Sequence, residues 1–103
     1  NNDALGELYS PLHPAILRVL SEIIATGQRA GKTVTVCGEM AGDSRFTRML
    51  LALGLTDFSM HPTSLLEVRR AIRDSEHAAL RRRAPALLRA GDRAGIERIL
   101  ATL

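Results

Sequence analysis

Apolar residues recur at helical spacing between residues 14 and 31. Pro14 suits the first turn of a helix, where its missing N–H costs no hydrogen bond. Gly31 follows the last periodic residue and favours a helix end. We therefore predict a helix that begins at Pro14 and stops near Gly31. One apolar stripe runs along it, made of Ile16, Leu17, Leu20, Ile23 and Ile24.

A run rich in β-branched residues, KTVTVC at residues 32–37, follows that helix. This composition predicts a strand. Because successive side chains of a strand point to opposite faces, Val34 and Val36 share one face. The opposite face carries three side chains, Thr33, Thr35 and Cys37.

Two glycines and two acids make GEMAGD, residues 38–43, a predicted loop. Asp43 or Ser44 can cap the next helix, because a short polar side chain accepts hydrogen bonds from the free N–H groups of the first turn. Gly54 is the expected end of that helix. TDFSM, residues 56–60, predicts a short extended segment.

A further helix is predicted over PTSLLEVRRAIRD, residues 62–74. Ser64 and Glu67 have the spacing of a capping box, in which each side chain bonds a backbone N–H of the other residue. The apolar side of this helix is expected to carry Leu65, Val68 and Ile72.

The last part of the chain is predicted to be helical, with one interruption. Pro85 lacks an N–H and crowds the preceding turn, so the stretch around it should kink or break. After Gly91, Asp92 can cap a final helix. The inward face of that helix is expected to carry Ile96, Ile99, Leu100 and Leu103.

Composition limits the class of protein. The 103 residues are 46% hydrophobic but only 3% aromatic, which allows one small domain with a core of aliphatic side chains. The single cysteine excludes an internal disulfide and fits a reducing, cytoplasmic compartment. No apolar run approaches the roughly 18 residues that span a bilayer, so no membrane partner is expected.

The charge is distributed unevenly along the chain. Residues 1–61 contain five basic and six acidic residues, whereas residues 62–103 contain nine basic and five acidic ones. A basic half can bind an anionic partner such as nucleic acid, or it can be a solvated helical surface. No aromatic residue is interleaved with Arg81, Arg82 and Arg83. We therefore favour the solvated surface and expect no nucleic-acid partner.

One good strand among helices is an incomplete piece of α/β architecture. The strand needs a partner, and TDFSM is too short to pair along both of its edges. We therefore expect the strand to pair outside this chain, and the chain alone to be poorly stable or to self-associate. This predicts that the sequence is a fragment of a larger fold.

Cys37 ends the predicted strand, and two interpretations of it are open. A lone cysteine is often a small buried hydrophobe. In parallel α/β folds, however, ligands bind beyond the carboxyl ends of strands, where Cys37 would lie. Nearby, Glu39 can be simply solvent-exposed and Asp43 a helix cap. No metal-ligand spacing links the cysteine to His13, His61 and His77.

Four segments, in this order and spacing, resemble one known family: LYSPLHPAIL, GKTVTVCGEMAGD, LLALGLTDFSM and VRRAIR. They are similar to the carboxyl end of the phosphoenolpyruvate–protein phosphotransferases, enzyme I of the bacterial sugar phosphotransferase system. The resemblance is strong from Tyr9 to about Arg73 and looser beyond. A similar Cys-Gly-Glu loop occurs in pyruvate phosphate dikinase and phosphoenolpyruvate synthase.

The resemblance implies an α/β fold, a (β/α)8 TIM barrel of roughly 250 residues. Residues 1–103 would be a carboxyl-terminal fragment of this phosphoenolpyruvate-binding domain, mostly helical by itself. They would supply the seventh helix, the eighth strand and the closing helices. The resemblance also implies Mg²⁺, with its ligands upstream of this chain, and a homodimeric parent protein.

The resemblance gives Cys37 a chemical role. In the family, the cysteine at this position exchanges a proton with the methylene carbon of the pyruvate enolate. A thiol has a reference pKa of about 8.5, which allows it to give and take a proton near neutrality. Gly38 would let the loop approach the substrate, and Glu39 would orient the thiol or an arginine. Phosphoenolpyruvate, pyruvate and a histidine phosphocarrier protein are the implied partners, in sugar uptake.

Two alternatives remain open from the sequence alone. The chain could come from a dikinase or synthase that passes phosphate to a nucleotide, or it could be a helical interaction module without catalysis. The sequence upstream of Asn1 would discriminate among them. A swivelling histidine domain would favour the phosphotransferase, and a nucleotide-grasp domain would favour the dikinase or synthase. A start codon near Asn1 would favour the interaction module.

Overall fold

The computed structural model describes residues 12–103, so the first residues of LYSPLHPAIL lie outside it. The described chain is mostly helical, and none of its helices is both long and apolar enough to cross a membrane. The elements, in chain order, are α2 (Pro14–Arg29), β1 (Thr35–Val36), α3 (Glu39–Gly42), α4 (Ser44–Ala52), β2 (Asp57–Phe58), the 3-10 helix η1 (Pro62–Ser64), α5 (Leu65–Arg73), α6 (His77–Arg89) and α7 (Arg93–Leu100).

Helix α2 begins and ends where the sequence predicts. Pro14 occupies the first turn, and the ring nitrogen of His13 accepts a hydrogen bond from the Ala15 N–H. Gly31 follows the helix end with φ +69°, a conformation that favours glycine. The apolar stripe is confirmed only in part: Leu17 and Ile24 are buried, whereas Ile23 is 52% exposed.

Strands β1 and β2 pair in parallel, with Thr35 opposite Asp57 and Val36 opposite Phe58. The expectation that the first strand has no adequate partner within the chain is therefore wrong on one edge. The predicted extended segment TDFSM supplies the partner, and KTVTVC is not the last strand. Only two residues of KTVTVC are paired as strand, because β2 is equally short.

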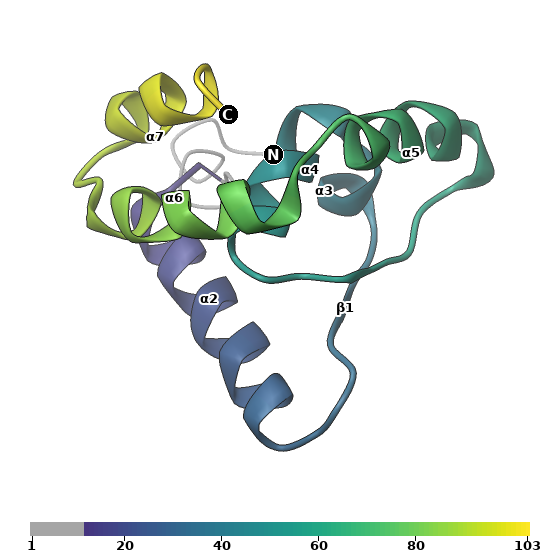
Figure 1. Ribbon diagram of the computed structural model, residues 1–103, viewed down its shortest axis with the longest axis horizontal. Helices are drawn as coiled ribbons and strands as arrows, with labels where there is room; N and C mark the ends of the chain where they lie inside the picture. The colour runs from purple at the N-terminus through teal and green to yellow at the C-terminus, as the bar shows by residue number, and fades with distance from the viewer. Residues whose placement is uncertain (1–11) are drawn as a thin grey trace, which may run out of the picture.

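The predicted alternation of side chains in the first strand is confirmed. Val34 and Val36 are half-buried, while Thr33, Thr35 and Cys37 are exposed. Val34 packs against α2 at Gly27, where a Cβ atom would collide with the Val34 methyl group Cγ2. Figure 1 shows the path of the chain that allows Val34 to contact α2: the helix descends to a turn, and the chain returns upwards through β1.

Helix α4 is the centre of the core. It packs against α5 and α6, and five of its nine residues are buried. The predicted cap at Asp43 and the predicted stop at Gly54 (φ +102°) are both confirmed. In Figure 1, α6 runs across the upper end of α2, with α5 and α7 towards its two ends. The buried residues of α4 are Thr47, Met49, Leu50, Leu51 and Ala52.

The predicted loop GEMAGD is wrong in part, because Glu39–Gly42 forms the short helix α3. The predicted capping box is also wrong. Ser64 has a helical backbone conformation and makes no capping hydrogen bond, because it already ends the 3-10 turn η1. On α5, Val68 is buried, but Leu65 and Ile72 are 42% and 38% exposed.

The predicted break at Pro85 is absent, because α6 continues from His77 to Arg89. Pro85 lies on the exposed side of the helix, and the opposite side is held in the core by Leu80, Ala84 and Leu87. The last prediction is confirmed: Asp92 caps α7 by accepting a hydrogen bond from the Gly95 N–H, and Ile96 is buried.

Candidate active site

The carboxyl ends of β1 and β2 meet at one edge of the two-stranded sheet. This follows from their parallel pairing, and the Ser59 N–H extends the pairing by donating to the Val36 carbonyl oxygen at 2.9 Å. Cys37 is the next residue after Val36, and its thiol is free and exposed. The interpretation of Cys37 as a buried hydrophobe is therefore wrong. The expected position, at a strand end and opposite the valines, is confirmed.

Gly38 makes the turn from the strand into α3. Its φ of +80° and ψ of −154° lie in a region that side-chain-bearing residues rarely adopt. Within the described residues, no atom outside its immediate neighbours lies within 4 Å of the place where a Cβ would be. Glycine is therefore required here by backbone conformation, and the space beside it is open.

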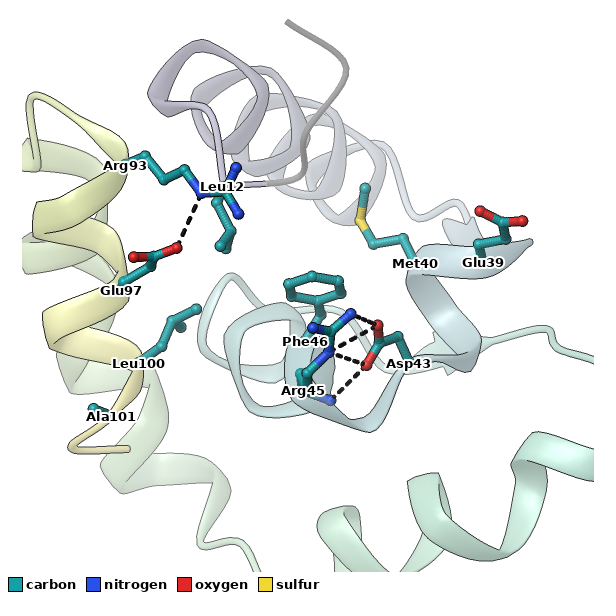
Figure 2. Close-up of a pocket in the computed structure, with 10 residues that line it drawn as sticks. All are labelled: Leu12, Glu39, Met40, Asp43, Arg45, Phe46, Arg93, Glu97, Leu100 and Ala101. Atoms are coloured by element: carbon teal, nitrogen blue, oxygen red, sulfur yellow. Dashed lines mark hydrogen bonds and ion pairs between the residues drawn. The ribbon is translucent and has the colours of Figure 1, made fainter. Parts of the chain in front are cut away.

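Glu39 is the first residue of α3 and is exposed, as one interpretation of the sequence expected. Figure 2 draws its carboxylate at the rim of a hollow, on the side away from α7. The chain thus delivers an exposed thiol, a glycine turn and an exposed carboxylate in three consecutive positions. An exposed thiol can exchange a proton with a bound molecule, and a neighbouring carboxylate can orient a donor group.

Asp43 is fully engaged by Arg45. Its Oδ1 accepts from the backbone N–H of Arg45 at 3.0 Å, and its two oxygens accept from the guanidinium at 2.6–3.1 Å. The hydrogen bonds from the Arg45 side chain lower the pKa of Asp43 below its ordinary value, while partial burial opposes the change. Asp43 therefore acts as a helix cap and ion-pair partner, which confirms that interpretation.

A hollow of about 810 Å³ lies beside α3, between the start of α4 and helix α7 (Figure 2). Its charged side chains include two ion pairs, Asp43 with Arg45 and Arg93 with Glu97. Cys37 is not among its lining residues. Among the described lining residues, Glu39 is the charged residue that these two ion pairs do not include. Its lining consists of Leu12, Glu39, Met40, Asp43, Arg45, Phe46, Arg93, Glu97, Leu100 and Ala101.

The segment after β2 lies against α3. A Cβ atom on Gly42 would be 3.2 Å from the Ser64 hydroxyl and 3.5 Å from Cβ of Met60. This close approach brings the residues that follow both strands together at the same edge. The sequence alone did not link Ser59 to Cys37. One sequence signal could have predicted that the two strands pair. The chain has the order strand, helix, short extended segment, which is typical of a parallel β–α–β unit.

The three histidines are not gathered at this edge. His13 caps α2, and His77 begins α6. His61 follows β2, but its Nδ1 is held by the backbone and hydroxyl of Thr63 at 3.3 and 2.9 Å. Within residues 12–103, no group of three His, Cys, Asp or Glu side chains could hold a metal ion.

Comparison with known proteins identifies the family. Residues 1–77 match the family described as "PEP-utilising enzyme, PEP-binding domain". Three similar curated proteins are each named phosphoenolpyruvate-protein phosphotransferase. The one from Cupriavidus necator is 51% identical over 71 residues, which are 69% of this chain and 12% of that protein.

Two further relatives match a slightly longer part of the chain. The protein from Priestia megaterium is 46% identical over 77 residues, 75% of this chain and 13% of its own length. The protein from Staphylococcus carnosus is 44% identical over 80 residues, 78% of this chain and 14% of its own length. The chain thus spans a small part of the curated relatives that it matches. It belongs to the phosphoenolpyruvate-utilising enzymes, through their phosphoenolpyruvate-binding domain.

Proposed function

We propose that the protein to which this chain belongs transfers the phosphoryl group of phosphoenolpyruvate to one of its own histidines. A histidine phosphocarrier protein then receives the group and passes it on for sugar uptake. The observation that carries this proposal is the exposed Cys37 at the carboxyl end of β1, within a region that matches the phosphoenolpyruvate-binding family. The names of the relatives favour this activity over that of a dikinase or synthase.

Cys37 is the proton donor in this proposal. Loss of the phosphoryl group from phosphoenolpyruvate leaves the enolate of pyruvate. The electron pair of the enolate double bond takes the thiol proton, so that an S–H bond breaks and a C–H bond forms at the methylene carbon. The oxygen becomes the carbonyl of pyruvate, and a thiolate is left at Cys37. A positioned acid of this kind is worth about 10²- to 10⁴-fold in rate.

Gly38 and Glu39 are the proposed substrate-side neighbours of the thiol. Open space beside Gly38 leaves its backbone accessible to a small carboxylate. Glu39 is exposed at the start of α3, where its carboxylate can orient the thiol or an arginine brought from elsewhere in the protein. Both roles depend on their position directly after Cys37.

We propose further that β1, helices α3 and α4, and β2 are one β–α–β unit of a (β/α)8 barrel. The parallel register of β1 and β2 supports this, because such barrels are built from parallel strands. The other strands, the phosphate-binding arginines and the phosphorylated histidine would come from upstream sequence. From the family resemblance, the Mg²⁺ ligands would also lie upstream. We expect a cytoplasmic homodimer.

Phosphorylation of the full-length protein tests the proposal. The protein is incubated with Mg²⁺ and phosphoenolpyruvate labelled with ³²P, and pyruvate release is followed. We expect an acid-labile phosphohistidine and stoichiometric pyruvate, with the label transferred when a phosphocarrier protein is added. Labelling that requires a nucleotide, or no labelling of the protein at all, would show that the activity is a different one.

A further inference from the structure

We propose that Ser59 positions the sulfur of Cys37 and donates a hydrogen bond to it when the thiolate forms. The inference rests on the proposed role of Cys37 and adds a second strand to the site. Ser59 follows β2 immediately, just as Cys37 follows β1. The sequence alone did not link Ser59 to Cys37.

The two residues follow the last pair of the sheet. Val36 pairs with Phe58, and each strand continues by one residue beyond this pair, to Cys37 and to Ser59. The Ser59 N–H donates to the Val36 carbonyl oxygen at 2.9 Å, which fixes the backbone at this step. Neighbouring strands lie about 4.8 Å apart. In the structure the free Cys37 thiol and the Ser59 hydroxyl are not hydrogen-bonded to each other, and the proposed bond forms with the thiolate.

Exposure shows that the two side chains share a face. Along β1, Val36 is half-buried and Cys37 is exposed; along β2, Phe58 is half-buried and Ser59 is exposed. Paired residues in a parallel sheet point to the same side. Met60 then returns to the buried side, where its Cβ lies close to Gly42. Ser59 therefore lies between two half-buried residues and is itself exposed, as Cys37 is.

The hydroxyl complements the charge that appears during the proposed reaction. Protonation of the enolate converts the neutral thiol into a thiolate, which is an acceptor only. A serine O–H can donate to it without being consumed, and hydrogen bonding to a charged form favours that form. Ser59 thus acts through Cys37 as a positioning residue and makes no contact with the substrate carbon.

The first test measures the thiol directly in the full-length protein. The rate of iodoacetamide alkylation at Cys37 is followed against pH, with mass spectrometry to confirm the site. We expect Ser59→Ala to raise the midpoint of this profile by about one pH unit, because a hydrogen bond to the thiolate is lost. Ser59→Thr keeps a hydroxyl and should restore the midpoint. Thr56→Val, which removes a hydroxyl at the other end of β2, should leave it unchanged.

The second test isolates the proton step. Exchange of the pyruvate methyl protons in D₂O is measured with the phosphorylated protein, and we expect Ser59→Ala to slow it about tenfold with the KM for phosphoenolpyruvate unchanged. An unchanged alkylation midpoint and exchange rate in Ser59→Ala would overturn the inference, even if Cys37→Ala abolishes exchange. If Cys37→Ala exchanges normally, the proposed role of Cys37 is itself wrong, and the inference that depends on it is withdrawn.

Discussion

The Nη1 atom of Arg81 donates a hydrogen bond to the carbonyl oxygen of Ala52 at 2.8 Å. Ala52 ends α4, where free carbonyl oxygens and the helix dipole favour a positive charge. Arg81 belongs to α6, beyond the matched family region at residues 1–77. The contact therefore joins the family region to the segment that follows it, and α4 and α6 pack as one unit.

Replacing Arg81 tests this connection. Arg81→Ala should lower the free energy of unfolding of the chain by about 1 kcal/mol, because a hydrogen bond from a charged group to a helix end is lost. Arg82→Ala is the matched control, since Arg82 is an exposed neighbour on the same helix. Urea titrations at one fixed protein concentration give both values. Equal effects for the two variants would show that the Ala52 contact is not stabilising.

A second stability prediction concerns Gly27. In an open helix, Gly→Ala stabilises by up to about 1 kcal/mol. Here the added Cβ would meet Cγ2 of Val34, so we expect Gly27→Ala to destabilise by about 1–3 kcal/mol through overpacking. Val34→Ala makes room, and the double variant should therefore lose less than the sum of the two single variants. Strict additivity in the urea titration would argue against the contact.

The ion pair of Asp43 with Arg45 should affect how the free energy of unfolding depends on pH. The pKa of folded Asp43 lies below its ordinary value of 3.8. A carboxyl group with a lowered folded pKa contributes stability above its unfolded pKa, and this is lost as the pH falls through the folded pKa. NMR titration of the Asp43 carboxyl carbon should give a midpoint below 3.8. Arg45→Gln should move it upwards, and an unmoved midpoint would mean that Arg45 does not cause the shift.

Cys37→Ala in the full-length protein tests the catalytic assignment. The thiol proton is lost, but the groups that hold the phosphate remain. We expect turnover to fall by about 10²-fold or more, with little change in phosphoenolpyruvate affinity. Steady-state pyruvate release and equilibrium binding measure the two quantities. Near-normal turnover in this variant would leave the exposed thiol without a role in the reaction.

The chain by itself should not bind phosphoenolpyruvate detectably. Its described residues provide no metal cluster, and four charged residues of its hollow are paired with one another as Asp43 with Arg45 and Arg93 with Glu97. Isothermal titration calorimetry with Mg²⁺ present should show no saturable heat. A Kd tighter than about 1 mM, near −4 kcal/mol, would show that the substrate site lies within these residues.

Local patterns were enough to predict several elements of this protein. The end of α2 near Gly31, the cap at Asp43, the stop at Gly54 and the cap at Asp92 were all predicted correctly. Each depends on a conformation or a hydrogen bond within a few residues of chain, so the sequence contains the full cause. The strand alternation that exposes Cys37 was predictable for the same reason.

Other features required contacts between distant residues. Pro85 does not end its helix, because burial of Leu80, Ala84 and Leu87 outweighs one missing hydrogen bond. Ser64 does not cap α5, because a preceding 3-10 turn gives it a helical conformation. Ile23 fits the apolar stripe of α2 but is exposed, since periodicity does not show how wide a face the neighbouring elements cover.

The candidate site also has features that local sequence predicts and features that depend on contacts between distant residues. Composition and alternation, which are local signals, predict that Cys37, Gly38 and Glu39 lie at the end of a strand and directly after it. The parallel pairing of β2 with β1, and the hydrogen bond from the Ser59 N–H to the Val36 carbonyl oxygen, came from the three-dimensional structure. The pairing joins segments more than twenty residues apart in the sequence, and local propensity does not specify which distant segment a strand will meet.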